Sequence, residues 1–153
     1  PTGHVYRYSA DGKLTCLLDN VPSPNGIVLN AAENLLLVAA TRSNSIWRVP
    51  LTPDGGVTKV GIFAYLSGGI GPDGMAMDAA GNLVVAHVGM GCAWVFSPKG
   101  EPLYRIQSCR GDGVTNMAFG GADGKTLFIT DSEHGAILKA SMPNAGARMF
   151  SHQ

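Results

Sequence analysis

Charge is scarce in this chain of 153 residues, and the charges that occur cancel. Only 14% of the residues are Asp, Glu, Lys or Arg, against about 25% in ordinary globular chains. The formal net charge is zero, and no run of Lys or Arg occurs. The chain therefore lacks the basic patch that nucleic-acid binding requires, and we expect no nucleic-acid partner.

Long apolar runs and paired cysteines are missing as well. No run approaches the roughly 20 apolar residues of a membrane span, so we expect no membrane partner. Cys16, Cys92 and Cys109 show neither metal-ligand nor Cys-x-x-Cys spacing, which favours free thiols in a reducing compartment and hence a cytoplasmic location. Because the chain begins at Pro1 and not at Met, the lack of a signal peptide carries little weight.

Helical periodicity is the third absence. No segment repeats apolar residues with a period of 3.6 over the length of a helix. Instead, 21 glycines punctuate short runs of apolar and alternating residues, as in chains made of strands and tight turns. The sequence therefore predicts an all-β protein.

The segment 72–87 organises the rest of the chain. It predicts a β-hairpin, because apolar residues flank a turn at 78–82 in which Asp78 is expected to cap the backbone. Asp73 stands between Pro72, which fixes its own φ, and Gly74, which lets the backbone bend. A carboxylate held in this way has a defined direction, as a ligand to an ion requires.

The same layout occurs twice more, with Asn25 and Asn116 in the place of Asp73. Asn25 and Asp73 are 48 residues apart, and Asp73 and Asn116 are 43 residues apart. Propeller blades repeat with a period of about 40–50 residues. Because equivalent positions of successive blades face a common axis, we expect these three side chains to gather at one end of that axis.

The repeat divides the chain into about three and a half blades. Residues 148–150 are expected to supply the last strand. Such an arc cannot close a ring alone and leaves two apolar faces uncovered, so a second copy or a missing N-terminal half is needed. The predicted units are a half blade at 1–20 and blades at 24–66, 72–107 and 114–150.

The three motifs resemble, in this order and at these spacings, the second half of the gluconolactonase, regucalcin and senescence marker protein family. The motifs are Pro24–Gly26, Pro72–Asp78 with Gly81–Leu83, and Thr115–Gly121, and the resemblance covers essentially the whole chain. It implies a six-bladed β-propeller with one divalent metal, usually calcium, at the end of the central tunnel. It also implies hydrolysis of a small-molecule lactone, such as a sugar lactone; relatives hydrolyse other lactones, esters or organophosphates.

Matched position by position, the resemblance implies that Asn25 and Asp73 bind the metal and that Asn116 lines the substrate pocket. Calcium is expected, with zinc or manganese as alternatives, and Asp73 is either a ligand only or also the catalytic group that deprotonates water. The family completes its site with a Glu and a further Asn from upstream blades, which this chain does not contain. Calcium takes about 6–8 ligands, so two oxygens alone would bind it weakly.

Simpler interpretations stay open beside this one. Pro-Asn-Gly and Pro-Asp-Gly are common turn sequences, and Asn116 has an equal chance of serving only the backbone. His87 would bind substrate or act as a general acid if it faces the tunnel, although a lone histidine is more often structural. For the whole chain the alternatives to a lactone hydrolase are a noncatalytic propeller arc that presents a binding face and a truncated remnant.

Overall fold

The computed structural model describes residues 2–148 and contains strands, turns and one short 3-10 turn, η1 (Thr41–Ser43). The prediction of an all-β chain is confirmed. The strands are β1 (Thr2–Tyr8), β2 (Leu14–Pro22), β3 (Pro24–Leu29), β4 (Leu35–Ala40), β5 (Ser45–Pro50), β6 (Gly61–Tyr65), β7 (Gly71–Met77), β8 (Leu83–Val88), β9 (Cys92–Phe96), β10 (Pro102–Gln107), β11 (Val114–Gly120), β12 (Thr126–Asp131) and β13 (Ala136–Ser141).

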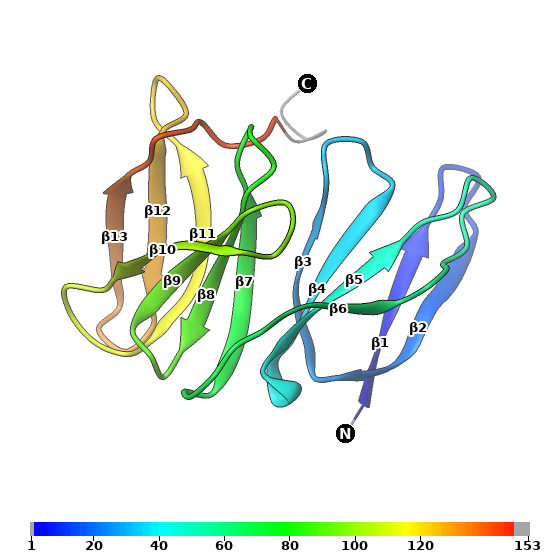
Figure 1. The fold of residues 1–153 in the computed structure, drawn as a ribbon, viewed down its shortest axis with the longest axis horizontal. Helices are drawn as coiled ribbons and strands as arrows, with labels where there is room; N and C mark the ends of the chain where they lie inside the picture. Colours follow the sequence, from blue (N-terminus) through cyan, green and yellow to red (C-terminus); the bar gives the residue numbers. More distant parts are fainter. Residues whose placement is uncertain (1, 149–153) are drawn as a thin grey trace.

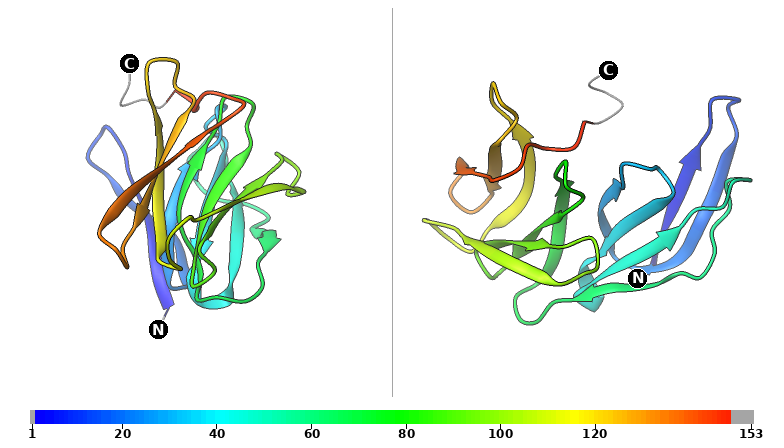
Figure 2. Two further views of the ribbon diagram at one scale, coloured as in Figure 1. Left: turned by 90° about the vertical axis from the view of Figure 1, so that its left-hand side faces the viewer. Right: turned by 45° about the horizontal axis from the view of Figure 1, so that its top comes forward.

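The strands form four antiparallel sheets in chain order (Figure 1). A β1–β2 hairpin is followed by the sheets β3–β4–β5–β6, β7–β8–β9–β10 and β11–β12–β13. The right-hand view of Figure 2 shows the sheets side by side around an arc. The first strands of the three larger sheets, β3, β7 and β11, are packed in sequence, β7 lying against both of the others. We call these three the inner strands.

The hairpin between β7 and β8 shows how the sequence sets the local structure. Asp78 Oδ1 accepts hydrogen bonds from the backbone N–H groups of Ala80 (3.0 Å) and Asn82 (2.8 Å). Gly81 follows with a φ of +83°, which a residue with a side chain adopts only under strain. The predicted capping role of Asp78 is confirmed.

The core consists of apolar layers between successive sheets. The central layer joins Val28 and Ile46 of one sheet to Met75 and Val85 of the next, and similar layers lie on either side of this pair of sheets. Strands such as β8 are buried on both faces, because each sheet has neighbours on two sides. Each buried Val, Leu, Ile or Met side chain stabilises the fold by about 1.5–3 kcal/mol.

The segment after β13 crosses the far ends of the inner strands, coloured red in Figure 1. The N–H of Ala79 donates to the carbonyl of Ala145, and the N–H of Ala147 donates to that of Met77, both at 2.8 Å. We call residues 144–147 the strap. Of the strand expected at 148–150, Arg148 is not in a strand, and the other two residues lie outside the described part of the chain.

Both ends of the arc present apolar side chains to solvent. Tyr8 is 74% exposed on the β1–β2 hairpin, and Ile137 is 65% exposed on β13 at the opposite end. Such faces are those that further blades cover in a closed ring. What covers them here, a second copy or additional blades, stays a prediction.

Candidate functional site

Each inner strand has a shift in its pairing register next to the predicted site residue, which is Asn25, Asp73 or Asn116. The pairing register shifts between Pro24 and Ile27 in β3, between Pro72 and Met75 in β7, and next to Asn116 in β11. A bulge bends a strand and redirects a side chain. The three predicted site residues therefore lie at equivalent, locally distorted positions of consecutive sheets.

Close backbone packing brings these positions together. A Cβ atom built on Gly26 would overlap the carbonyl oxygen of Asp73, and one built on Gly74 would overlap the side chain of Asn116. The start of β3 thus touches the start of β7, which in turn touches the start of β11. Glycine is required at both contacts, because a side chain would push neighbouring strands apart.

Asp73 is half-buried, whereas Asn25 and Asn116 are exposed. Burial raises the pKa of the Asp73 carboxyl above its usual value of 3.8, and the Asn25 amide partly opposes this rise. Among residues 2–148 Asp73 forms no ion pair, and the one ion pair there joins His134 to Asp131. The carboxylate is therefore partly desolvated and has no cationic partner within that part of the chain.

Two side-chain amides lie nearby, that of Asn25 beside Asp73 and that of Asn116 beside Gly74. Asn25 Nδ2 lies 3.5 Å from the hydroxyl oxygen of Thr41, and this hydroxyl donates to the carbonyl of Pro72 at 2.7 Å. Thr41 thus links the side chain of Asn25 to the residue before Asp73. Asn116 Oδ1 accepts from the N–H of Met117 at 2.8 Å, and the amide nitrogen of Asn116 can donate a hydrogen bond to a ligand.

His87, the fourth site residue predicted from the sequence, does not lie on an inner strand. It belongs to β8, the second strand of its sheet, and is fully buried. Its Nδ1 accepts from Trp94 Nε1 at 3.1 Å, and its Nε2 lies 3.0 Å from the carbonyl oxygen of Gly68. Both ring nitrogens are occupied, and we leave His87 out of the proposed ligand and substrate contacts.

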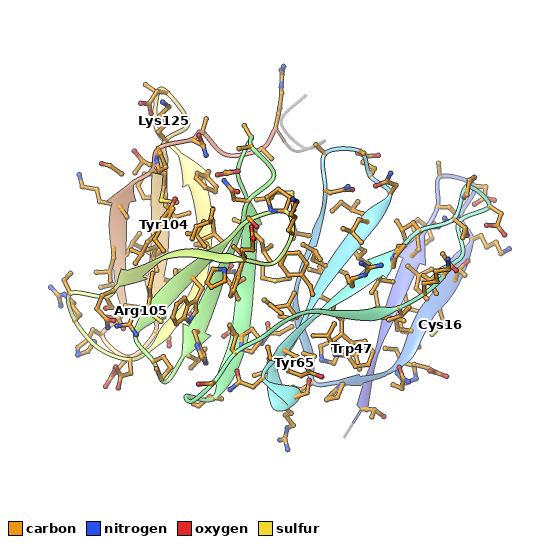
Figure 3. All side chains as sticks on the ribbon, viewed as in Figure 1. Cys16, Trp47, Tyr65, Tyr104, Arg105 and Lys125 are labelled. Atoms are coloured by element: carbon orange, nitrogen blue, oxygen red, sulfur yellow. The ribbon has the colours of Figure 1, made fainter. Side chains whose placement is uncertain are left out.

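Further along the inner strands, the wall changes from polar to apolar. A cavity of about 230 Å³ lies there, with Ile27, Met75 and Ala118 among its lining residues and Ala147 of the strap at one side. The charged and aromatic side chains labelled in Figure 3 lie elsewhere; Tyr104 and Arg105 are on β10, where Arg105 lies over the ring of Trp94. The polar side chains of Asn25, Asp73 and Asn116 are thus confined to one end of the inner strands, and apolar side chains follow.

A second cluster of potential metal ligands forms the β12–β13 turn. Asp131, Glu133 and His134 lie within reach of a common ion. Asp131 instead accepts from His134 Nδ1 at 3.0 Å and from two backbone N–H groups, and Glu133 accepts from the N–H of Asp112 at 2.9 Å. These bonds fix two neighbouring loops to each other, which explains the cluster without an ion.

Sequence comparison assigns the chain to a family. A family model described as the SMP-30/Gluconolactonase/LRE-like region matches residues 1–133. This chain belongs to that family. A curated relative is the lactonase drp35 of Staphylococcus haemolyticus, which is 37% identical over 111 residues; the match covers 69% of this chain and 34% of drp35.

Solved structures of the family share the fold. The calcium-binding protein regucalcin of Agrobacterium tumefaciens aligns with a TM-score of 0.81 and 25% identity over 94% of this chain. A gluconolactonase of Xanthomonas campestris aligns with a TM-score of 0.78 and 27% identity over 92% of it. These matches confirm the predicted family and the partial β-propeller.

The chain spans about a third of the length of the drp35 lactonase, and about half of that of the regucalcin. Among the described residues, no helix has the length and apolar character to cross a bilayer. The cytoplasmic location stays a prediction.

Proposed function

We propose that this chain supplies two metal ligands and the catalytic carboxylate of a divalent-metal-dependent lactone hydrolase. The observation that carries the proposal is the convergence of Asn25 and Asp73 at the starts of adjacent inner strands, where the Asp73 carboxylate has no ion-pair partner among residues 2–148. The family membership and the names of its lactonase relatives support the reaction class.

The donor set fits a hard divalent cation. A carboxylate oxygen from Asp73 and an amide oxygen from Asn25 are the ligand types that calcium prefers. A cation would also offset the cost of burying the Asp73 charge, which its raised pKa reflects. Calcium is the proposed ion, in line with the description of the regucalcin neighbour as a calcium-binding protein; zinc and manganese are the alternatives.

The bound ion would supply Lewis acidity, polarising the lactone carbonyl and lowering the pKa of water. Asp73 would accept the proton of the attacking water as a general base. The water oxygen then bonds to the carbonyl carbon, the ring C–O bond breaks, and a proton is delivered to the ring oxygen, so that a hydroxy acid is formed. The amide nitrogen of Asn116 would donate a hydrogen bond to the bound lactone.

The complete active site needs more than these residues, because calcium takes about 6–8 ligands. We propose that further blades, or a second copy of the chain, close the ring and contribute the remaining ligands. The exposed apolar ends of the arc support such a closure.

The proposal is tested on the protein expressed from its own gene. Calcium, manganese and zinc are titrated by calorimetry, and hydrolysis of gluconolactone is measured with each ion. We expect Asp73→Ala to weaken metal binding by about 100-fold or more, since even residues that only orient ligands contribute 10–100-fold. Asp123→Ala, which alters an exposed turn on β11–β12, is the matched control and should leave binding unchanged. Metal-independent turnover, or binding without turnover, would refute the hydrolase.

A further inference from the structure

The loop that leads into β7 is held by two side chains, one from the β4–β5 turn and one from strand β8. The carbonyl oxygen of Gly68 accepts from Asn44 Nδ2 at 2.7 Å and lies 3.0 Å from His87 Nε2. Asn44 itself has a left-handed backbone, with a φ of 49°. The carbonyl oxygen of Gly68 thus connects the loop to both the β4–β5 turn and strand β8.

The tautomer of His87 follows from its neighbours. The indole N–H of Trp94 is only a donor, so His87 Nδ1, at 3.1 Å, accepts its hydrogen bond and carries no proton in the neutral ring. The proton is then on Nε2, where it is donated to Gly68. Trp94 therefore determines which atom of His87 faces the loop.

The loop needs such an anchor because its own backbone is permissive. Gly68, Gly69 and Gly71 all have positive φ values, of 76°, 62° and 137°, and glycine loses more conformational freedom on folding than any other residue. Asp73 is only five positions beyond Gly68 along the chain. The position of the carboxylate therefore depends on what fixes this glycine-rich segment.

The geometry points to His87 as a positioning residue: its Nε2–H, oriented by Trp94, holds the carbonyl of Gly68 and so fixes the segment that places Asp73 beside Asn25. A second bond, from the N–H of Ile70 to the carbonyl of Val88 at 2.7 Å, connects the same loop to the same strand. The role in catalysis rests on the proposed function, whereas the anchoring itself does not.

The test compares His87→Leu, which removes both polar atoms, with His87→Gln, whose amide can both donate to Gly68 and accept from Trp94. Val84→Ala, also fully buried on β8, is the control for general destabilisation. In His87→Leu the amide of Ile70 should exchange its hydrogen about tenfold faster than in Val84→Ala, because one anchoring hydrogen bond is lost from a local opening unit. His87→Gln should restore slow exchange.

Equal exchange in His87→Leu and Val84→Ala, or equal exchange in the Leu and Gln variants, would overturn the anchoring role. Should the Leu variant not fold, the nitrogen NMR spectrum of the unmodified protein decides: His87 must be the Nε2–H tautomer. In Trp94→Phe, which removes the indole donor, the Nδ1–H form should appear beside it. An Nδ1–H ring in the unmodified protein overturns the proposal.

The role of His87 in catalysis is tested by measuring metal affinity and turnover. His87→Leu should weaken metal affinity about 10–100-fold, as substitutions of residues that orient ligands do, and saturating metal should recover most of the turnover. A loss of turnover that depends only on the fraction of folded protein, and that added metal does not reverse, contradicts the positioning role of His87. If the unmodified protein binds no metal, the proposed function fails while the exchange result still decides the anchor.

Discussion

Gly26 lies against the carbonyl oxygen of Asp73, with the backbone nitrogen of Met75 next nearest. These atoms belong to the backbone, which cannot move aside as a flexible side chain can. The contact sets the separation of β3 and β7 and, with it, the separation of Asn25 and Asp73.

Gly26→Ala should therefore push the two strands apart. We expect metal affinity to fall by about tenfold or more, since small displacements of ligating groups have effects of that size, and the measurement is calorimetric titration. Gly61→Ala on β6 is the control, because nothing lies within 4 Å of a Cβ at that position. Unchanged affinity in Gly26→Ala would contradict the close approach of the inner strands.

Asp78 connects the β7–β8 turn to the strap. Its Oδ2 accepts from Asn82 Nδ2 at 2.7 Å and from Asn144 Nδ2 at 2.9 Å, in addition to the two backbone bonds of Oδ1. Asp78→Ala should lower the free energy of unfolding by about 2–3 kcal/mol, because four hydrogen bonds to a buried, charged acceptor are lost.

The control for Asp78 is the equivalent turn of the next sheet. Asp123 accepts one backbone hydrogen bond, from Lys125, at an exposed site. Asp123→Ala should cost about 1 kcal/mol or less. Urea unfolding curves measure both variants, and equal losses would show that the link to the strap contributes nothing.

The inner strands and the positions of their polar residues could be predicted from the sequence, because a repeated motif, here at spacings of 48 and 43 residues, places equivalent residues at equivalent points of successive sheets. Asn25, Asp73 and Asn116 follow from that rule alone. The turn at Asp78 was predictable for a different reason, since the backbone hydrogen bonds that form the turn lie within residues 78–82.

The environment of His87 could not be predicted in the same way. Every second residue of a strand is expected to share a face, but β8 lies between two other strands of its sheet and between two neighbouring sheets, so both of its faces are buried. Trp94 lies on the neighbouring strand of the same hairpin as His87. The bonds of His87 to Gly68 and of Thr41 to Pro72, by contrast, join segments that only tertiary packing brings together. No local pattern in the sequence predicts the bonds of His87 to Gly68 and of Thr41 to Pro72.

Acid should destabilise the protein through His87. Burial lowers the pKa of its ring below the usual value of 6.5, and the hydrogen bond to Gly68 opposes this only in part. As the pH falls below 6.5, the unfolded chain binds the proton first, so the free energy of unfolding decreases until the folded pKa is passed. Unfolding curves at a series of pH values should show that the free energy of unfolding decreases less in acid for His87→Gln than for the unmodified protein. An identical pH dependence would exclude His87 as a source of the acid destabilisation.

The cysteines should differ in reactivity. All three are free thiols, of which Cys16 and Cys109 are exposed and Cys92 is buried. Burial raises the pKa of the Cys92 thiol, so little of the reactive thiolate forms. An aromatic disulfide reagent should label Cys16 and Cys109 promptly and Cys92 only after denaturant is added. Prompt labelling of Cys92 would contradict the close packing of β9.

The central claim is that Asn25 and Asp73 bind one divalent ion at the starts of adjacent inner strands. The most direct measurement is a crystal structure of the protein, expressed from its own gene and grown with manganese, recorded where manganese scatters anomalously. The account predicts an anomalous peak bonded to the Asp73 carboxylate and the Asn25 amide oxygen, and no such peak in Asp73→Ala. A peak at Asp131, Glu133 and His134 instead, or side chains of Asn25 and Asp73 that point away from each other, would contradict it.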